Sequence, residues 1–190
     1  MKKMSTLFEI EYFGKGSKGD IKNIIKEENY WVYSQPNVIA TRKRDGTAVA
    51  IINGELYKRY DAKQGKIPPA GSIPCCEPDS VTGHHPHWIK VLTEDKSNKY
   101  LLDTYYSLQY PLGGGTYEFC GEKVGNNKEN VQGHCFFRHG SEILDLKDFS
   151  FESIKSYLEN PTNDIEGIVF HNLDTNQMCK IRKTDFGVTR

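Results

Sequence analysis

The chain has 190 residues, and its 25 basic and 25 acidic residues give a formal net charge of +0 at pH 7. A chain of this length is typical of a single domain and can bury a hydrophobic core without disulfides. Because no overall field attracts nucleic acid, any contact with nucleic acid must come from local basic patches.

The cysteines and the hydropathy pattern indicate a reducing environment. Five cysteines are present, and neither their odd number nor their spacing is typical of a disulfide framework. The sequence shows no signal-peptide pattern and no apolar run long enough to span a bilayer. We therefore expect an intracellular, cytoplasmic protein (in the host cytoplasm if it is viral) with no membrane partner.

The first predicted elements are a strand over residues 6–13 and a short helix over 20–28. In the helix, Asp20 is the expected N-cap, and Ile21, Ile24 and Ile25 share one face. The loop over 14–19 between them is rich in glycine but lacks the G-K-[ST] ending of a P-loop. We therefore assign no phosphate-binding role to this loop.

Two turns are predicted in the next segment. The apolar run that begins at Val38 leads into Lys43, a tight Asp45-Gly46 turn follows, and a second apolar run extends to Ile51. This pattern predicts a β-hairpin with the lysine at its corner, in which the glycine also fits a position with positive φ. Asn53-Gly54 predicts the turn of a second hairpin, so three successive antiparallel strands are expected around the lysine.

Residues 62–90 contain five prolines and are predicted to lack regular elements. Two adjacent cysteines and three histidines in this segment raise the possibility of a zinc site. Adjacent cysteines chelate one ion poorly, however, and the usual C-x-x-C spacing is absent. Polar packing of the loop is therefore the preferred interpretation.

The remaining pattern alternates strands with a few helices. Helices are predicted over 94–108 and 150–158, and strands over 116–121, 134–138, 165–171 and 177–182. A polar loop is expected over 125–132. The predicted fold class is α+β, with largely antiparallel β-sheets flanked by helices.

Charged residues interrupt four of the apolar strand patterns. They are Lys43, Asp45, Glu118, Glu166, Lys180 and Arg182. Isolated charges are costly to bury, so residues of this kind tend to pair or to face a cleft. A cleft that combines several cations with acids suits a polyphosphate and a divalent metal ion.

These residues lie in four motifs that resemble those of the covalent nucleotidyltransferase superfamily of RNA ligases, DNA ligases and capping enzymes. Lys43-Arg44-Asp45-Gly46 resembles the K-x-D-G motif, whose lysine is linked covalently to the nucleotide. In chain order, the third to fifth motifs are similar to Tyr117-Glu118-Phe119-Cys120-Gly121, Glu166-Gly167-Ile168-Val169 and Lys180-Ile181-Arg182. The stretches YKRYDAKQGKIPP, TGHHPHW and CKIRKTDFG look closest to small RNA ligases of phages, viruses and eukaryotes.

The resemblance implies a single minimal nucleotidyltransferase (adenylation) domain over residues 1–190, of the ATP-grasp-like ligase type, without a C-terminal accessory domain. It implies an ATP-dependent RNA ligase that joins 5′-phosphate and 3′-hydroxyl RNA ends, as in RNA repair. The implied cofactors are ATP, as the AMP donor, and Mg²⁺ or Mn²⁺. The implied partner is RNA with these ends, and a monomer is favoured.

The resemblance also implies a role for each matching residue. The implied catalytic residues are Lys43, Asp45, Glu166 and Lys180, with Glu166 also serving as the metal ligand. The implied nucleotide-binding residues are Thr41, Arg42, Lys43, Gly46, Arg59, Glu118, Lys180 and Arg182. Among these, Glu118 would bind the ribose, Arg59 would contact nucleotide or RNA phosphate, and Lys180 and Arg182 would neutralise charge on the α-phosphate.

The chemistry explains why these residue types are needed. The lysine must be a neutral amine to attack phosphorus, and neighbouring cations such as Arg42, Arg44 and Lys180 would favour that form. The sequence departs from the family pattern at two positions. Arg182 replaces the usual second lysine of the fifth motif, and Arg42 stands where related ligases often have an acid.

Two other functions remain open from the sequence. One is a DNA ligase or guanylyltransferase of the same superfamily. The other is a nucleotide- or RNA-binding protein without catalytic activity. Adenylate formation in the presence of ATP would argue against the second, and a comparison of nicked RNA, nicked DNA and GTP would separate the members of the superfamily.

Overall fold

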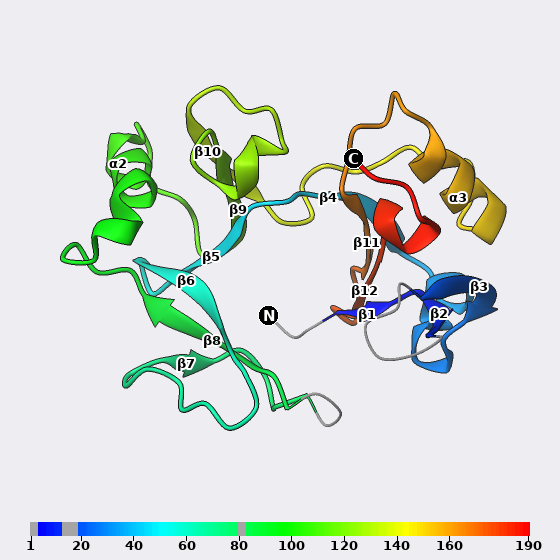
Figure 1. Cartoon of the computed structure of the whole chain (residues 1–190), viewed down its shortest axis with the longest axis horizontal. Helices are drawn as coiled ribbons and strands as arrows, with labels where there is room; N and C mark the ends of the chain where they lie inside the picture. The colour runs from blue at the N-terminus through cyan, green and yellow to red at the C-terminus, as the bar shows by residue number, and fades with distance from the viewer. Residues whose placement is uncertain (1–3, 13–18, 80–82) are drawn as a thin grey trace. The chain divides into compact units, whose positions relative to one another are not determined.

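The computed structural model describes residues 4–12, 19–79 and 83–190, and the fold is α+β with mostly antiparallel sheets and few helices (Figure 1). These residues form two compact units. The continuous unit comprises Asp45–His139, and the split unit comprises Met4–Arg44 and Gly140–Arg190. Each unit has its own sheet and its own hydrophobic core.

The split unit is built on a four-stranded sheet in the order β1-β12-β11-β4. The strands are β1 (Ser5–Thr6), β4 (Val38–Lys43), β11 (Gly167–Asn172) and β12 (Met178–Arg182). β1 runs parallel to β12, and the other neighbours are antiparallel. A separate antiparallel pair consists of β2 (Phe8–Glu11) and β3 (Asp20–Ile25).

Helices cover the apolar face of the four-stranded sheet. Strand alternation places Ala40, Ile168, Phe170 and Ile181 on one face, where all are almost fully buried. They pack in one core with α1 (Trp31–Ser34) and α3 (Phe151–Glu159). Two 3₁₀ turns, η1 (Glu27–Asn29) and η4 (Lys183–Phe186), complete the unit. The same alternation leaves Thr41, Lys43, Lys180 and Arg182 on the opposite face.

The continuous unit is built on a six-stranded antiparallel sheet in the order β10-β9-β5-β6-β8-β7. The strands are β5 (Thr47–Ile52), β6 (Glu55–Ala62), β7 (Ile73–Pro74), β8 (His85–Lys90), β9 (Gly115–Gly121) and β10 (His134–Arg138). Its helical elements are η2 (Lys96–Asn98), α2 (Lys99–Ser107) and η3 (Gly125–Asn127).

The two faces of the six-stranded sheet differ. One face packs Val49, Ile51 and Phe119 against Leu101 of α2. The other face carries a smaller cluster of Ala50, Tyr57 and Trp88. The side chains of Glu118 and Ala48 share the second face because these residues are paired across β9 and β5.

Most of the elements predicted from the sequence are present. The Asn53-Gly54 turn joins β5 to β6, and both residues have the positive φ of a two-residue hairpin turn, 52° and 79°. The predicted helices over 94–108 and 150–158 correspond to α2 and α3, and the four later strands to β9, β10, β11 and β12. Ser150 caps α3, as its hydroxyl accepts a hydrogen bond from the backbone N–H of Ser153.

The predicted hairpin around Lys43 is wrong. β4 pairs with β11, with Lys43 opposite Gly167, whereas β5 pairs with β6 and β9 in the other sheet. Gly46 does not have a positive φ either. The position needs glycine because a Cβ there would lie 2.4 Å from the backbone oxygen of Phe119.

The predicted helix over 20–28 is also wrong, because residues 20–25 form β3. Pairing with β2 and contact between Ile21 and Ile25 and the core of the split unit outweigh the helical spacing of the isoleucines. The strand predicted over 6–13 is divided into β1 and β2 by the buried Leu7. Phe13 and residues 14–18 of the predicted loop lie outside the described residues.

The proline-rich segment is more regular than predicted. Residues 85–90 form β8, which pairs with both β6 and β7. Pro86 lies near the start of this strand, where the missing N–H is tolerated, and its carbonyl accepts a hydrogen bond from Cys75 N at 2.9 Å. Cys76 and His85 are linked by a hydrogen bond between the backbone oxygen and Nε2, at 2.8 Å.

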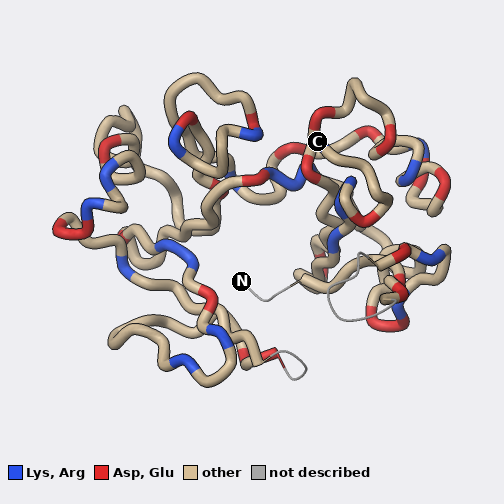
Figure 2. The backbone as a smooth tube through the Cα atoms, in the orientation of Figure 1, with Lys and Arg blue, Asp and Glu red and all other residues tan. Residues whose placement is uncertain are grey.

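Charges of both signs are spread along both units, and neither sign is confined to one element (Figure 2). The distribution agrees with the net charge of +0. Of the helices that the structure describes, none has the length and apolar character needed to cross a membrane.

Candidate active site

Three adjacent strands bring the predicted catalytic residues of the split unit onto one face of its sheet. Lys43, Gly167 and Arg182 are paired across β4, β11 and β12, and their side-chain positions therefore face the same side. Thr41 and Lys180 flank Val169 in the same way, two residues further along the strands. The polar face thus carries residues that come from distant parts of the chain.

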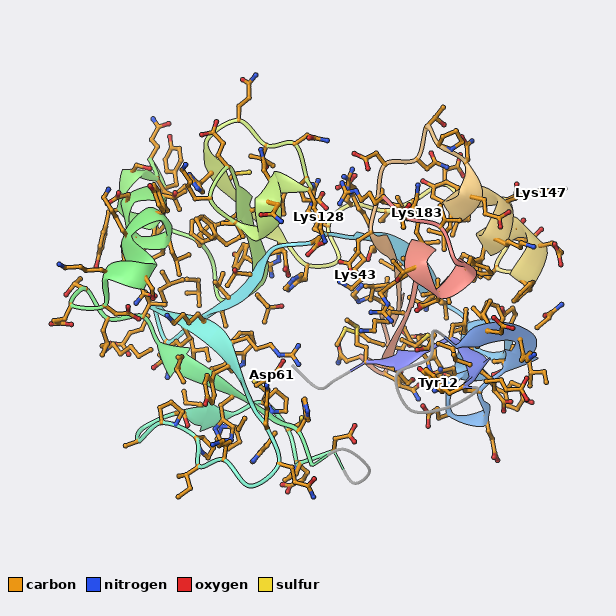
Figure 3. All side chains as sticks on the ribbon, in the orientation of Figure 1. Tyr12, Lys43, Asp61, Lys128, Lys147 and Lys183 are labelled. Atoms are coloured by element: carbon orange, nitrogen blue, oxygen red, sulfur yellow. The ribbon has the colours of Figure 1, made fainter. Side chains whose placement is uncertain are left out.

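Lys43 lies at the end of β4 and is only partly exposed (Figure 3). Its Nζ donates a hydrogen bond to Oε2 of Glu166, the residue just before β11, and the two form an ion pair. It also approaches the backbone oxygen of Arg44 at 3.5 Å. The side chains of Lys43 and Glu166 remain 20% and 21% exposed, so the pair is accessible to a ligand.

Gly167 allows the strands to approach each other closely beside this pair. A Cβ at position 167 would lie 2.2 Å from the backbone oxygen of Ile181 and 2.8 Å from Cα of Arg182. Any side chain would therefore push β12 away from β11. Such a shift would move Arg182 away from Lys43 and Glu166.

Lys180 lies in a positively charged environment. Burial, together with the positive charges of Arg182 and Lys43, lowers the pKa of Lys180 from 10.5 to about 8. The negative charges of Glu166 and Asp185 oppose this shift. Because the cations repel one another, a bound anion would relieve this repulsion and favour the charged form of Lys180.

Asp185 orients Arg182 and was not identified from the sequence. Its carboxylate accepts hydrogen bonds from the Arg182 backbone N–H at 2.8 Å, from Nη2 at 2.9 Å and from Nε at 3.4 Å. These hydrogen bonds raise the pKa of Arg182, so its positive charge is secure. The spacing of three residues, with an acid at the third position of a helical turn, is a capping-box pattern that could have indicated this contact.

Thr41 and Arg42 were also predicted to bind the nucleotide, and both are engaged within the protein. Thr41 is buried, and its hydroxyl contacts the Val169 backbone oxygen at 3.2 Å and His171 Nε2 at 2.9 Å. Arg42 is paired with Ile168 and therefore lies on the opposite face from Lys43. It forms an ion pair with Glu142 and donates a hydrogen bond from Nη2 to the Asp164 backbone oxygen.

Three further predicted residues lie together in the continuous unit. The backbone N–H of Gly46 donates to Oε1 of Glu118 at 3.0 Å. Asp45 forms an ion pair with Lys128 at 2.8 Å, and its backbone N–H donates to Glu129 Oε1 at 3.1 Å. Asp45 thus contacts residues of the loop after β9, and the next residue, Gly46, donates to one oxygen of Glu118.

His139 is a second residue that the sequence did not reveal. Its Nε2 lies 2.8 Å from Oε2 of Glu118, and its Nδ1 lies 3.0 Å from the hydroxyl of Thr116. The β9–β10 register, which pairs Arg138 with Tyr117, places the histidine beside Thr116. His139 and Glu118 are 21 residues apart in the sequence, so only the strand pairing could have indicated their contact.

Arg59 is the remaining predicted residue, and it lies on β6. Its Nε and Nη2 donate to Oδ1 of Asp61, at 3.1 Å and 3.0 Å. The ion pair is partly exposed, so replacing Asp61 by a phosphate as the partner of Arg59 would cost little free energy.

The split unit offers one carboxylate that a divalent cation could use beside the lysine. Residues 4–12, 19–79 and 83–190 contain no group of three or more His, Cys, Asp or Glu side chains arranged to hold a metal ion. Mg²⁺ needs no such group, because it commonly binds through one or two carboxylates, water and substrate phosphates. Glu166 therefore fits Mg²⁺ or Mn²⁺ that arrives with a polyphosphate.

Comparison with family models gives no match to this chain, and comparison with curated proteins gives no significant match either. The functional argument therefore rests on the residues themselves. The polar face of the four-stranded sheet combines the amine of Lys43, the carboxylate of Glu166 and two further cations. Such a set can bind an anion and direct an amine towards it.

Proposed function

We propose that the protein is an ATP-dependent RNA ligase of the covalent nucleotidyltransferase type, with a nucleotidyltransferase fold and Lys43 as the nucleophile. The observation that supports this best is the gathering of Lys43, Glu166, Lys180 and Arg182 on one sheet face. The residues come from three sequence motifs, and each motif alone is only weak evidence for the function. The RNA substrate rests on the sequence resemblance to small RNA ligases.

The first step is transfer of AMP to the lysine. The ion pair with Glu166 opens, Nζ of Lys43 loses a proton to solvent, and the amine attacks the α-phosphorus of ATP. The new N–P bond forms as the bond from this phosphorus to the bridging oxygen of pyrophosphate breaks. Pyrophosphate leaves with the electron pair of that bond, and the enzyme holds a lysyl-AMP.

The cations of the sheet face stabilise this transfer. Negative charge builds on the α-phosphate oxygens in the transition state, and preorganised donors aimed at such charge are among the strongest catalytic groups. Lys180 and Arg182 fill this role, and Asp185 holds Arg182 in a fixed orientation. A divalent cation held by Glu166 would supply further neutralisation of the phosphate charge.

The later steps pass the AMP to RNA. An oxygen of the RNA 5′-phosphate attacks the phosphorus of lysyl-AMP, and the N–P bond breaks with its electron pair moving to nitrogen. The nitrogen of Lys43 takes up a proton from solvent and is released as an amine. The 3′-hydroxyl of the second RNA end then loses its proton and attacks the activated 5′-phosphate. A phosphodiester forms and AMP leaves.

Intact-mass measurement tests the first step. The protein is incubated with ATP and Mg²⁺, beside the Lys43→Ala variant and the control Lys99→Ala, whose lysine pairs with Asp103 on an exposed helix face. We expect a gain of one AMP in the native protein and in the control, and none in Lys43→Ala. A native protein that binds ATP without gaining mass would instead be a non-catalytic binding protein.

The substrate is tested separately with the adenylated protein. Nicked RNA, single-stranded RNA with a 5′-phosphate and nicked DNA are supplied in parallel, and GTP replaces ATP in a further arm. We expect adenylated RNA and then joined RNA. Joining confined to DNA, or a GMP adduct in place of an AMP adduct, would assign the protein to another branch of the superfamily.

A further inference from the structure

We propose that His139, held by Thr116, is a positioning residue that fixes Glu118 as the acceptor for the nucleotide 2′-hydroxyl and so selects ATP over dATP. This inference rests on the proposed function, in which Glu118 binds the ribose. It adds a residue outside all four motifs and gives it a role in choosing the sugar.

The geometry is a continuous chain of hydrogen bonds. The Thr116 hydroxyl lies 3.0 Å from Nδ1 of His139, Nε2 of the same ring lies 2.8 Å from Oε2 of Glu118, and Gly46 N lies 3.0 Å from Oε1. The backbone N–H of His139 also donates to the backbone oxygen of Thr116 at 3.1 Å. His139 is therefore held to Thr116 of β9 through both its ring and its backbone, and its ring also contacts the Glu118 carboxylate.

The direction of the contact with Glu118 does not depend on the charge of the ring. An ionised carboxylate has no donor, so Nε2 must carry the hydrogen in this contact. When the ring is neutral, Nδ1 accepts from the Thr116 hydroxyl, and when the ring is charged, Nδ1 donates to it. In either case Nε2–H donates to Glu118.

Both carboxylate oxygens are thus restrained, one by Gly46 and one by His139, and each can still accept a further hydrogen bond. The Glu118 side chain is only 13% exposed and the His139 side chain 25%. A partly desolvated carboxylate that is fixed by two donors selects ligands that present hydroxyl donors. A ribose presents a 2′-hydroxyl, and a deoxyribose lacks it.

Gly46 adds a reason why this arrangement is precise. A Cβ at position 46 would lie 2.4 Å from the Phe119 backbone oxygen and 3.1 Å from Cγ of Glu118. Only glycine allows its N–H to reach the carboxylate from this side. The carboxylate therefore lies between a backbone donor, Gly46 N–H, and a side-chain donor, His139, that can be changed by mutation.

The test measures kcat and KM for Lys43-AMP formation with ATP and with dATP in the native protein and in His139→Ala, His139→Gln and Thr116→Val. His84→Ala, in the segment before β8, is the matched histidine control. We expect His139→Ala to lower kcat/KM for ATP about tenfold, mainly through KM, and to leave the value for dATP nearly unchanged.

The glutamine variant should restore part of the preference because its amide can donate to Glu118, and Thr116→Val should lose less of it than His139→Ala. An equal fall for ATP and dATP would indicate a merely structural role and would overturn the inference, as would an unchanged ratio. If the native protein forms no adduct at all, the proposed function fails first, and the inference falls with it.

Discussion

The two sheets of this protein use charged residues in different ways. On the polar face of the four-stranded sheet, Lys43, Lys180 and Arg182 lie close enough to repel, and this repulsion contributes to the lowered pKa of Lys180. Two of these cations also pair with acids, Lys43 with Glu166 and Arg182 with Asp185. In the six-stranded sheet, Lys90 is paired with Glu55 and Arg59 with Asp61. The carboxylate of Glu118 is likewise held by two donors.

The difference indicates what each sheet is suited to bind. Cations that repel one another gain by binding an anion, because the anion relieves their repulsion. A carboxylate that is already fixed by two donors gains by accepting a neutral hydroxyl instead. The four-stranded sheet is therefore suited to an anion such as a phosphate, and Glu118 of the six-stranded sheet is suited to a hydroxyl group.

The largest expected effect comes from removing one of the cations of the four-stranded sheet. Lys180→Met removes a partly buried positive charge while keeping a side chain of similar length. Under the proposed function, we expect adenylation of Lys43 to slow by roughly 100-fold or more. Lys90→Met, in the six-stranded sheet, should leave the rate unchanged because that lysine is exposed and paired with Glu55. Single-turnover rates with ATP measure both, and equal rates would contradict the anion-binding role.

A second change tests whether each sheet depends on a glycine in a strand or directly beside one, Gly167 in β11 and Gly46 just before β5. Gly167→Ala and Gly46→Ala would each force a Cβ against neighbouring backbone, at 2.2 Å and 2.4 Å. We expect each to lower the free energy of unfolding by about 1–3 kcal/mol. Urea denaturation measures the loss in each variant.

Gly114→Ala is the matched control for these two variants. A Cβ there would meet its nearest atom at 3.9 Å, which is ordinary contact, and the residue does not have a positive φ. The control should be neutral or stabilising by less than about 1 kcal/mol. Equal losses in all three variants would show that the close approaches have no special cost.

A third change tests the role of Asp185 in holding Arg182. Asp185→Ala leaves the backbone N–H and guanidinium of Arg182 without this acceptor, and we expect a stability loss of about 1–3 kcal/mol together with a raised KM for ATP. Asp185→Asn keeps one acceptor oxygen and should lose less. Asp103→Ala, which breaks an exposed helical pair, should cost at most about 0.5 kcal/mol and leave KM unchanged.

The last prediction is a pH dependence that arises from Lys180. Its pKa is about 8 in the folded protein and 10.5 as the ordinary value, so the unfolded chain binds more protons between these values. The contribution of Lys180 to the free energy of unfolding therefore rises with pH across that window. The affinity for ATP should fall across the same window, because the lysine loses its charge.

Urea denaturation and nucleotide titration over this pH range check the two trends. In Lys180→Met the contributions of this lysine to both trends should be absent. Stability that falls in the native protein relative to the variant as the pH rises from about 8 would contradict the assignment.

Local sequence patterns predicted those elements whose partners are near in the chain. The Asn53-Gly54 turn fixes β5 and β6, and a serine cap begins α3. The hairpin at Lys43 failed because the partner of β4 is β11, far away in sequence, and no local signal reports such pairing. The helix over 20–28 failed because the same isoleucines fit a strand once β2 is beside them.

In the candidate site, too, sequence motifs predicted some residues, whereas others depend on contacts between distant parts of the chain. Lys43, Glu166, Lys180 and Arg182 were named from motifs, and the sheet brings all four together. Asp185 and His139, which orient Arg182 and Glu118, lie outside the motifs and are defined by a helical turn and by strand register. Positioning residues of this kind depend on tertiary contacts, and for that reason a single sequence conceals them.

The pairing of β4 with β11 has a consequence for how the chain is made. During translation β4 leaves the ribosome early, and the whole continuous unit is synthesised before β11 follows. The nascent continuous unit can complete its sheet while β4 still presents unpaired edges to the chaperones that protect such strands. A polypeptide whose synthesis stops before Gly167 thus carries Lys43 but lacks the strand that pairs with β4. Under the proposed function, such unfinished copies would not consume ATP.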